Sequence, residues 1–317
     1  MPGEDTDHGV RQLVLVHGHR EARTRVPPER KALVDIAAAV MADEAGGIGI
    51  TYAGFALTAL PHKRLTDDAA WEKTGHRVRL LIEPGRRGGG TGQATFIGVP
   101  YGAYARMILL YLQTQAVRTN SREVELGRSL RDWLGRMGIT VGGKTARTLR
   151  EQAARIAACS LKFFWEGEDA SGWTRGGIVA SGFRFRAAEG EQDSLWEDRV
   201  VLDEAFWRAL RDHPVPLREA AIRQLRDRSM SLDLYVWLAY RLHTLARPMP
   251  VSWPALRAQF GAGYAEAHTF RRDFRKALAP AVAAYPEARV ELEDGGVVLH
   301  PSRPPVAPRL VAVTSRS

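Results

Sequence analysis

The pattern of polar and apolar positions is most regular in residues 265–278, near the C-terminal end of the chain. At about 100° per residue, Phe270, Phe274, Ala277 and Leu278 fall on one side of a helix. The opposite arc carries His268, Arg271, Arg272, Arg275 and Lys276. One face therefore suits a protein core and the other suits phosphates, although an ordinary solvated surface helix shows the same pattern.

The flanking segments favour a helix that binds phosphates over an ordinary surface helix. Residues 231–245 predict a buried helix, 248–252 a short extended piece and 253–260 a short helix that begins after Ser252. Residues 288–300 alternate with period two around Asp294-Gly295-Gly296, which predicts a hairpin. Helix, strand, helix, helix and hairpin is the order of a winged helix, in which the hairpin wing contacts DNA backbone or minor groove. The basic helix stands in the recognition position.

The first half of the chain repeats this order without repeating the sequence. An apolar helix is predicted over 103–117, a basic extended segment over 118–125, a short helix over 130–137 and a long helix over 144–160. On the long helix, Leu149, Ala153 and Ile156 share one face, and the facing arc carries Lys144, Arg147, Thr148, Gln152 and Arg155. Strand-like runs follow at 161–165, 177–186 and 198–202, and 217–230 predicts a helix that connects the halves.

The segments before residue 96 predict an extension. Residues 1–30 are polar and aperiodic, which is typical of a flexible arm. Residues 31–42 predict a helix, 49–60 and 76–83 two strands, and the glycine-rich run 84–92 a flexible loop or linker. The expected fold class is α+β: a flexible arm (1–30), an N-terminal helix and strands packed on the first domain (31–95), a first winged-helix domain (96–213), a second one (214–306) and a tail (307–317).

Composition narrows the class of partner. The 317 residues carry a formal charge of +9, which favours a polyanion. A single cysteine, Cys159, excludes an internal disulfide and a cysteine-based zinc cluster. No apolar run reaches the roughly 18 residues that span a bilayer, and acidic residues occupy the N-terminus where a signal peptide is positive. We expect a soluble, cytoplasmic protein.

One short motif suggests a different chemistry. Residues 138–145, GITVGGKT, match the phosphate-binding loop pattern G-x-x-x-x-G-K-[ST]. That loop needs a buried strand leading into it, whereas an amphipathic helical pattern with Trp133, Leu134 and Met137 precedes Gly138. We therefore interpret the glycines as the turn before a recognition helix, where Lys144 and Thr145 could bind a DNA phosphate. Elsewhere the sequence indicates no catalytic constellation, metal site or cofactor; in particular, we expect no metal at His17 and His19.

Several separated motifs resemble the RepA family of plasmid replication initiators. They are GFALTALPHK (54–63), GVPYG (98–102), QAVRT (115–119), SREVELGRSL (121–130), DLYVWLAYRL (233–242) and PSRPPV (301–306), and they cover most of the chain in the order of the family. The resemblance implies tandem winged helices that bind repeats of a plasmid origin and act with host replication-initiation and helicase-loading proteins. The family motifs do not include a phosphate-binding loop.

These inferences give one candidate site and three alternatives. The expected contacts to double-stranded DNA are Lys144, Thr145, Arg147, Thr148, Arg155, Arg118 and Arg122 in the first half and His268, Thr269, Arg271, Arg272, Arg275 and Lys276 in the second. The protein is not expected to be an enzyme, and a homodimer is possible. The alternatives are a winged-helix repressor, an NTPase that uses residues 138–145, and a scaffold whose winged helices bind protein.

Overall fold

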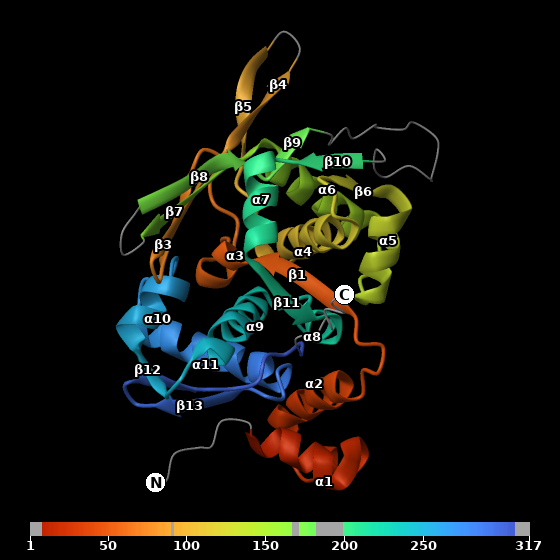
Figure 1. Ribbon diagram of the computed structural model, residues 1–317, viewed down its shortest axis with the longest axis vertical. Helices are drawn as coiled ribbons and strands as arrows, with labels where there is room; N and C mark the ends of the chain where they lie inside the picture. Colours follow the sequence, from red (N-terminus) through yellow and green to blue (C-terminus); the bar gives the residue numbers. More distant parts are fainter. Residues whose placement is uncertain (1–7, 90–91, 167–170, 182–198, 308–317) are drawn as a thin grey trace, which may run out of the picture.

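The computed structural model describes residues 8–89, 92–166, 171–181 and 199–307. The second half of the chain forms a winged helix from α9 (Ser229–Arg241), β12 (Met249–Ser252), α10 (Trp253–Phe260), α11 (Ala267–Ala283), β13 (Arg289–Glu293) and β14 (Gly296–His300) (Figure 1). A 3₁₀ turn, Leu242–Thr244, follows α9. The sheet is antiparallel, with strand order β12-β14-β13. The element order predicted from sequence is confirmed, including the start of α10 after Ser252, whose hydroxyl accepts a hydrogen bond from the Ala255 amide.

The first half builds a second unit of the same kind. Its elements are α4 (Gly102–Thr119), β6 (Glu123–Glu125), α5 (Gly127–Arg136), α6 (Gly143–Ala158), β9 (Val179–Ser181) and β10 (Arg199–Leu202). The strand order β6-β10-β9 again places the third strand of the unit between the first and the second. The prediction of an α+β fold with two winged helices is confirmed. The extended segment predicted over 118–125 is shorter than expected, because α4 continues to Thr119. Part of the strand predicted over 177–186 lies outside the described residues.

A four-stranded antiparallel sheet joins the extension to the first unit. It contains β2 (Trp71–Gly75), β3 (Val78–Glu83), β7 (Ser160–Glu166) and β8 (Ser171–Gly177) in that spatial order. The strand-like run 161–165 therefore pairs with β3 of the extension and not with the wing. The side chains of Leu80, Ile82 and Phe163 are buried on one face of this sheet and close the core of the first unit.

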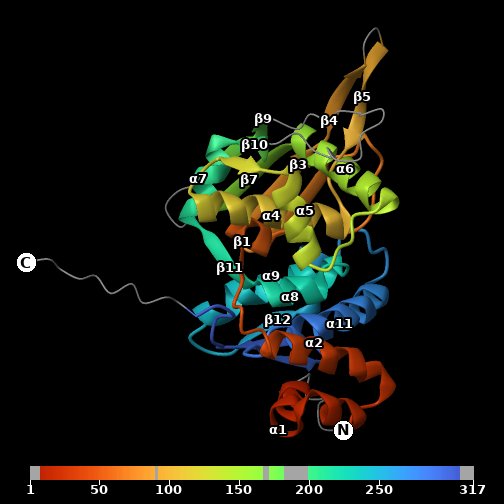
Figure 2. The ribbon, with the colours of Figure 1, turned by 90° about the vertical axis from the view of Figure 1, so that its right-hand side faces the viewer.

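The described residues of the glycine-rich run after β3 form strands of a hairpin and not a flexible loop. Strands β4 (Gly85–Gly89) and β5 (Gly92–Gly98) pair antiparallel, and Figures 1 and 2 show them projecting well beyond the rest of the molecule. The prediction was wrong because it rested on side-chain pattern, whereas a two-stranded ladder is held by backbone hydrogen bonds that glycine can also make.

A two-stranded ribbon lies at the junction of the halves. Strand β1 (Ile48–Tyr52) pairs with β11 (Pro214–Arg218), and around them lie α3 (Ala53–Leu57), α7 (Glu204–Asp212) and α8 (Glu219–Leu225). The expected strand 49–60 thus ends at Tyr52, and the expected connecting helix 217–230 is divided into the end of β11, α8 and the start of α9. One hydrophobic core extends through both winged-helix units and this junction.

The N-terminal arm is helical. Helix α1 (His8–Thr24) packs on α2 (Lys31–Met41) after a short 3₁₀ turn, Pro28–Arg30. The expectation of a flexible arm was wrong for this segment, because Val10, Ala22 and Val26 bury against α2 in a small separate cluster. Helix α2 itself packs on α8 and α11 of the second unit, and not on the first domain as expected. Ile36 and Val40 of α2 belong to the main core, whereas Val34 and Ala37 face α1.

A buried ion pair links the first helices of the two units. Arg106 on α4 donates from Nε and Nη2 to the two carboxylate oxygens of Asp233 on α9, both at 2.6 Å. The same guanidinium donates to the carbonyls of Leu60, Pro61 and Gly102. Both side chains of the pair are largely shielded from solvent, so the contact joins the two halves inside the core. None of the described helices is long and apolar enough to cross a membrane.

Candidate nucleic-acid interface

Helix α11 presents the basic arc that its sequence predicts. Phe270, Phe274 and Leu278 are buried. The side chains of His268, Arg271, Arg272, Arg275 and Lys276 are exposed, and Thr269 is partly exposed. The apolar face is fixed by ring contacts, such as those of Phe270 and Phe274 with Trp253 at 6.5 and 5.7 Å between centroids. The helix cannot rotate without breaking this packing, so the cations face outward.

Trp253, at the start of α10, organises the centre of this arc. The guanidinium carbons of Arg271 and Arg275 lie 5.7 and 5.4 Å from the centroid of its indole ring. The indole Nε1–H donates to the carbonyl of Asp294 at 2.9 Å, and the Trp253 amide donates to the carbonyl of Gly295 at 3.0 Å. A cation over an indole face is stabilised by the ring quadrupole. The two arginines are therefore partly ordered before any ligand arrives.

A second positioning residue was missed at the sequence level. Arg257 on α10 donates from Nη2 to the carbonyls of Tyr264 and Ala265, at 3.2 and 2.7 Å, and so closes the turn into α11. Gly263 in that turn has φ +86°, a conformation that favours glycine. No periodic pattern marks a side chain that binds carbonyls of a turn, so sequence reasoning had no signal for Arg257.

Two features reduce the positive charge of the second winged helix. Arg272 is exposed but pairs with the neighbouring Asp273 at 2.8 Å, a hydrogen bond that holds the pKa of the Asp273 carboxyl below its usual value. The wing carries exposed Glu291, Glu293 and Asp294. Like charges repel phosphates, so the backbone contact that wings commonly make is not expected from the tip of this one.

Helix α6 presents a second basic strip. Lys144 and Arg147 are exposed, and Thr145 and Thr148 are partly exposed; the Thr148 hydroxyl donates to the carbonyl of Lys144 at 3.2 Å. Arg150 is also exposed and continues the strip. Arg150 was not among the predicted contacts, although its spacing of three residues from Arg147 places it on the same helical face.

Arg155 is not part of the exposed strip, and the expected DNA contact there was wrong. Its side chain is buried. The guanidinium pairs with Asp67 and Glu151, each at 3.0 Å, and donates to the carbonyl of Val99 at 3.2 Å. All the donors are directed into the protein, so none is free for a phosphate.

The two remaining arginines from the first half lie near the ends of α4 and β6. Arg118 is exposed in the last turn of α4. Arg122 is partly exposed, donates to the carbonyl of Leu202 at 3.0 Å and pairs with Glu204 at 3.3 Å. Arg122 therefore ties β6 to the end of β10, which leaves its guanidinium less available than that of Arg118.

The loop that matches the phosphate-binding pattern connects two helices. Gly138 has φ +73° and follows α5, and α6 begins at Gly143. Every strand pairing among the described residues is antiparallel, and no described strand leads into this loop. The setting that the nucleotide-binding mechanism requires is absent from this part of the chain.

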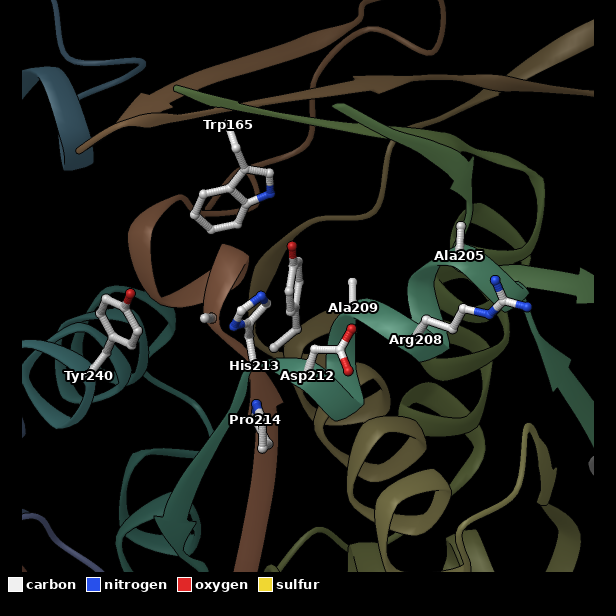
Figure 3. A pocket seen from close by; sticks show the side chains of 10 residues that line it. Trp165, Ala205, Arg208, Ala209, Asp212, His213, Pro214 and Tyr240 are labelled. Carbon is white, nitrogen blue, oxygen red and sulfur yellow. The ribbon is translucent and has the colours of Figure 1, made fainter. Parts of the chain in front are cut away.

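The two basic helices face the same way. Figure 2 shows the amino-terminal ends of α6 and α11 on the right-hand side of the molecule, one above the other, with α7 on the left. Next to α7 lies a cavity of about 880 Å³ that none of the expected site residues lines. Its wall combines Tyr52, Trp165 and Tyr240 with Arg208, Asp212 and His213 (Figure 3). The cavity contains charges of both signs, in contrast to α6 and α11.

Among the described residues, no group of histidine, cysteine and carboxylate side chains could hold a metal ion. The fold and the two outward basic helices define a tandem winged-helix protein. Residues 99–253 match the family model described as "Plasmid encoded RepA protein". This match confirms the resemblance to RepA plasmid replication initiators that the separated motifs indicate.

Two solved structures of RctB are similar to the chain. One, of selenomethionine derivatives of RctB domains 2 and 3, has 16% identity and a TM-score of 0.45 and covers 76% of this chain and 91% of that chain. The other, of RctB domains 2–3, has 15% identity and the same TM-score of 0.45 and covers 77% and 93%. No curated protein matches the chain in sequence.

Proposed function

We propose that the chain is a plasmid replication initiator that binds double-stranded DNA at repeats of its origin, with α11 in one major groove and α6 in another. Binding would promote opening of the origin and recruitment of the helicase, with host initiation and helicase-loading proteins as partners. The family match supports the role in plasmid replication.

The observation that carries the DNA-binding part is the ordered arginine pair on α11. Arg271 and Arg275 are exposed, lie over one indole ring and belong to a helix whose other face is locked into the core. Arginine forms bidentate hydrogen bonds to guanine O6 and N7, and an ordered side chain loses less entropy on binding.

The remaining candidate contacts divide between the two helices and the end of α4. In the second module they are His268, Thr269, Arg272 and Lys276, and in the first they are Lys144, Thr145, Arg147, Thr148, Arg150 and Arg118. Arg122 would act mainly by holding β6 in place, and Arg155 is not proposed as a contact. Lysine and threonine suit phosphate oxygens, which fix register and orientation.

The test replaces Arg271 and Arg275. We expect R271A/R275A to bind duplex fragments from the replicon that encodes the chain at least about 100-fold more weakly than wild type, because good bidentate base contacts are each worth about 1–3 kcal/mol. The measurement is a gel-shift titration on fragments tiled across that replicon, with unchanged circular dichroism and melting temperature as evidence of folding.

The matched control is R208A/R211A on α7, which removes the same charge from the opposite side of the molecule. Arg211 lies over the ring of Trp207 at 4.7 Å, as Arg275 lies over Trp253. Wild-type affinity in R271A/R275A, or equal losses in both double variants, would rule out α11 as the sequence-reading element.

The replication step is tested separately from binding. We expect the wild-type protein, on supercoiled plasmid that contains the bound fragment, to expose unpaired thymines to permanganate at one side of the binding site. A protein that binds specifically and never produces such reactivity would be a DNA-binding repressor and not an initiator.

A further inference from the structure

We propose that the projecting β4–β5 hairpin is an additional arm for duplex DNA, which binds phosphates beside the groove occupied by α6 through Arg86 and Arg87. This inference rests on the proposed function and extends it to a part of the chain that lies outside both winged helices.

The charge of the hairpin is unbalanced. From Pro84 to Gly98 the sequence contains two arginines and no carboxylate. Both Arg86 and Arg87 are exposed, and neither forms an ion pair with any described residue. Several other arginines near the first winged helix have acidic partners, as Arg64 has Asp67 and Arg79 has Glu72. Two guanidinium groups that have no acidic partner among the described residues, on a projecting ribbon, suit a polyanion.

An aromatic residue orders one of these cations. Arg86 lies directly opposite Phe96 in the register of the hairpin, and its guanidinium carbon is 4.2 Å from the centroid of the ring. Phe96 is one of three large hydrophobic residues that the described part of the chain exposes. A phenyl ring in water on an isolated hairpin adds little to a core, but it holds a guanidinium group by a cation–π contact.

The base of the hairpin is fixed to α6. A Cβ on Gly85 would lie 2.0 Å from the carbonyl oxygen of Ala158, and a Cβ on Gly98 would lie 2.0 Å from Nη1 of Arg155. Arg155, buried between Asp67, Glu151 and the Val99 carbonyl, therefore acts as a positioning residue for the arm. Its burial explains why an arginine on the recognition helix makes no outward contact.

The length of the hairpin suits contact with a DNA duplex. Strand β5 contains seven residues, and at about 3.3 Å per residue such a strand is roughly 23 Å long, about twice the width of a major groove of roughly 12 Å. Figure 2 shows the hairpin rising from the end of α6 toward the side on which the amino-terminal end of α6 lies. DNA placed against Lys144, Arg147 and Arg150 would pass beside the arm.

The experiment compares R86A/R87A with wild type on the duplex that wild type binds best. We expect a five- to twenty-fold loss of affinity at 150 mM salt. The slope of log K against log salt should fall by about 2, since each lost phosphate contact removes roughly 0.9 from it. The hydroxyl-radical footprint should shorten at one edge only, and R86K/R87K, which keeps the charge, should recover most of the affinity.

The controls separate this inference from the proposed function. R208A/R211A should leave affinity, slope and footprint unchanged. If R86A/R87A also leaves them unchanged while R271A/R275A loses binding, the arm is excluded and the winged-helix proposal stands. If R86A/R87A weakens binding to single strands but not to the duplex, the assignment to duplex DNA is overturned. If no variant affects binding, the proposed function itself fails.

Discussion

A buried lysine links the protonation of one side chain to the stability of the whole protein. Lys73 on β2 is 4% exposed. Burial lowers the pKa of its ammonium group to about 8, although the Asp233 carboxylate opposes the shift. Because the unfolded chain keeps this proton to higher pH than the folded chain does, folding becomes more favourable as pH rises from about 8 toward the unfolded pKa of about 10.4. Below pH 8 the folded protein contains a charge that is poorly solvated.

We predict that Lys73→Met removes this pH dependence. The free energy of unfolding of wild type minus that of Lys73→Met should rise by about 2 kcal/mol between pH 7.5 and 10. The difference is the useful quantity, because buried Tyr52 and Tyr111, whose pKa values burial raises to about 12, titrate identically in both proteins. Urea unfolding at five pH values measures it, and a flat difference would mean that Lys73 is solvated in the folded state.

At the residue scale, periodicity identified the faces of α6 and α11 but not what covers them. Arg155 falls on the same arc as Lys144 by helical geometry. It is nevertheless buried, because the base of the β4–β5 hairpin and Asp67, far away in sequence, cover that end of α6. Arg271 and Arg275 have no such cover. A single sequence contains no signal for a contact between residues 67 and 155, so exposure along a basic arc could not be predicted.

Among the elements, those with a clear apolar period were predicted well and those held by tertiary contact were missed. The apolar pattern identified α4 and α9, which are buried on nearly every side, and α10 and α11, which each bury one face. Helix α1 has no such stripe along its whole length, and Gly18, at φ +72°, interrupts it. Its stability comes from α2, whose Val34 and Ala37 complete the small cluster.

We predict that Val34→Asp releases α1 and leaves the two winged helices folded. Val34 is fully buried in the small cluster, apart from the main core, and a carboxylate there has no described partner. Trypsin should then cleave after Arg20, Arg23 and Arg25 at least about tenfold faster, while the remaining fragment stays resistant. Leu15→Asp is the control, because Leu15 is 61% exposed on the same helix; equal cleavage of both variants would show that α1 is frayed in the wild type.

At the scale of the whole molecule, the Arg106–Asp233 pair couples the two modules. It connects α4 to α9 inside a core that both share, and it also binds three backbone carbonyls. Removing one partner of a buried pair leaves an uncompensated charge, which typically costs about 3–5 kcal/mol, whereas replacing both with apolar groups is often close to neutral.

We predict a large coupling in a double-mutant cycle of this pair. Arg106→Leu and Asp233→Leu should each lower the free energy of unfolding by about 3 kcal/mol or more, and the double variant should lose at least about 2 kcal/mol less than the sum of the two. Chemical unfolding followed by tryptophan fluorescence measures all four proteins. Additive losses would indicate that the carbonyl contacts of Arg106, and not its partnership with Asp233, stabilise the junction.

The continuous core has a consequence for target choice. Because α6 and α11 are anchored in one interior, joined through β1 and β11 as well as by the ion pair, their separation and relative rotation are set when the protein folds. A B-form duplex turns once in about 10.5 base pairs, so two sequence blocks displaced by half a turn would face away from each other. Under the proposed function, we therefore expect the protein to select DNA by the distance and helical phase between two sequence blocks as well as by the bases within them.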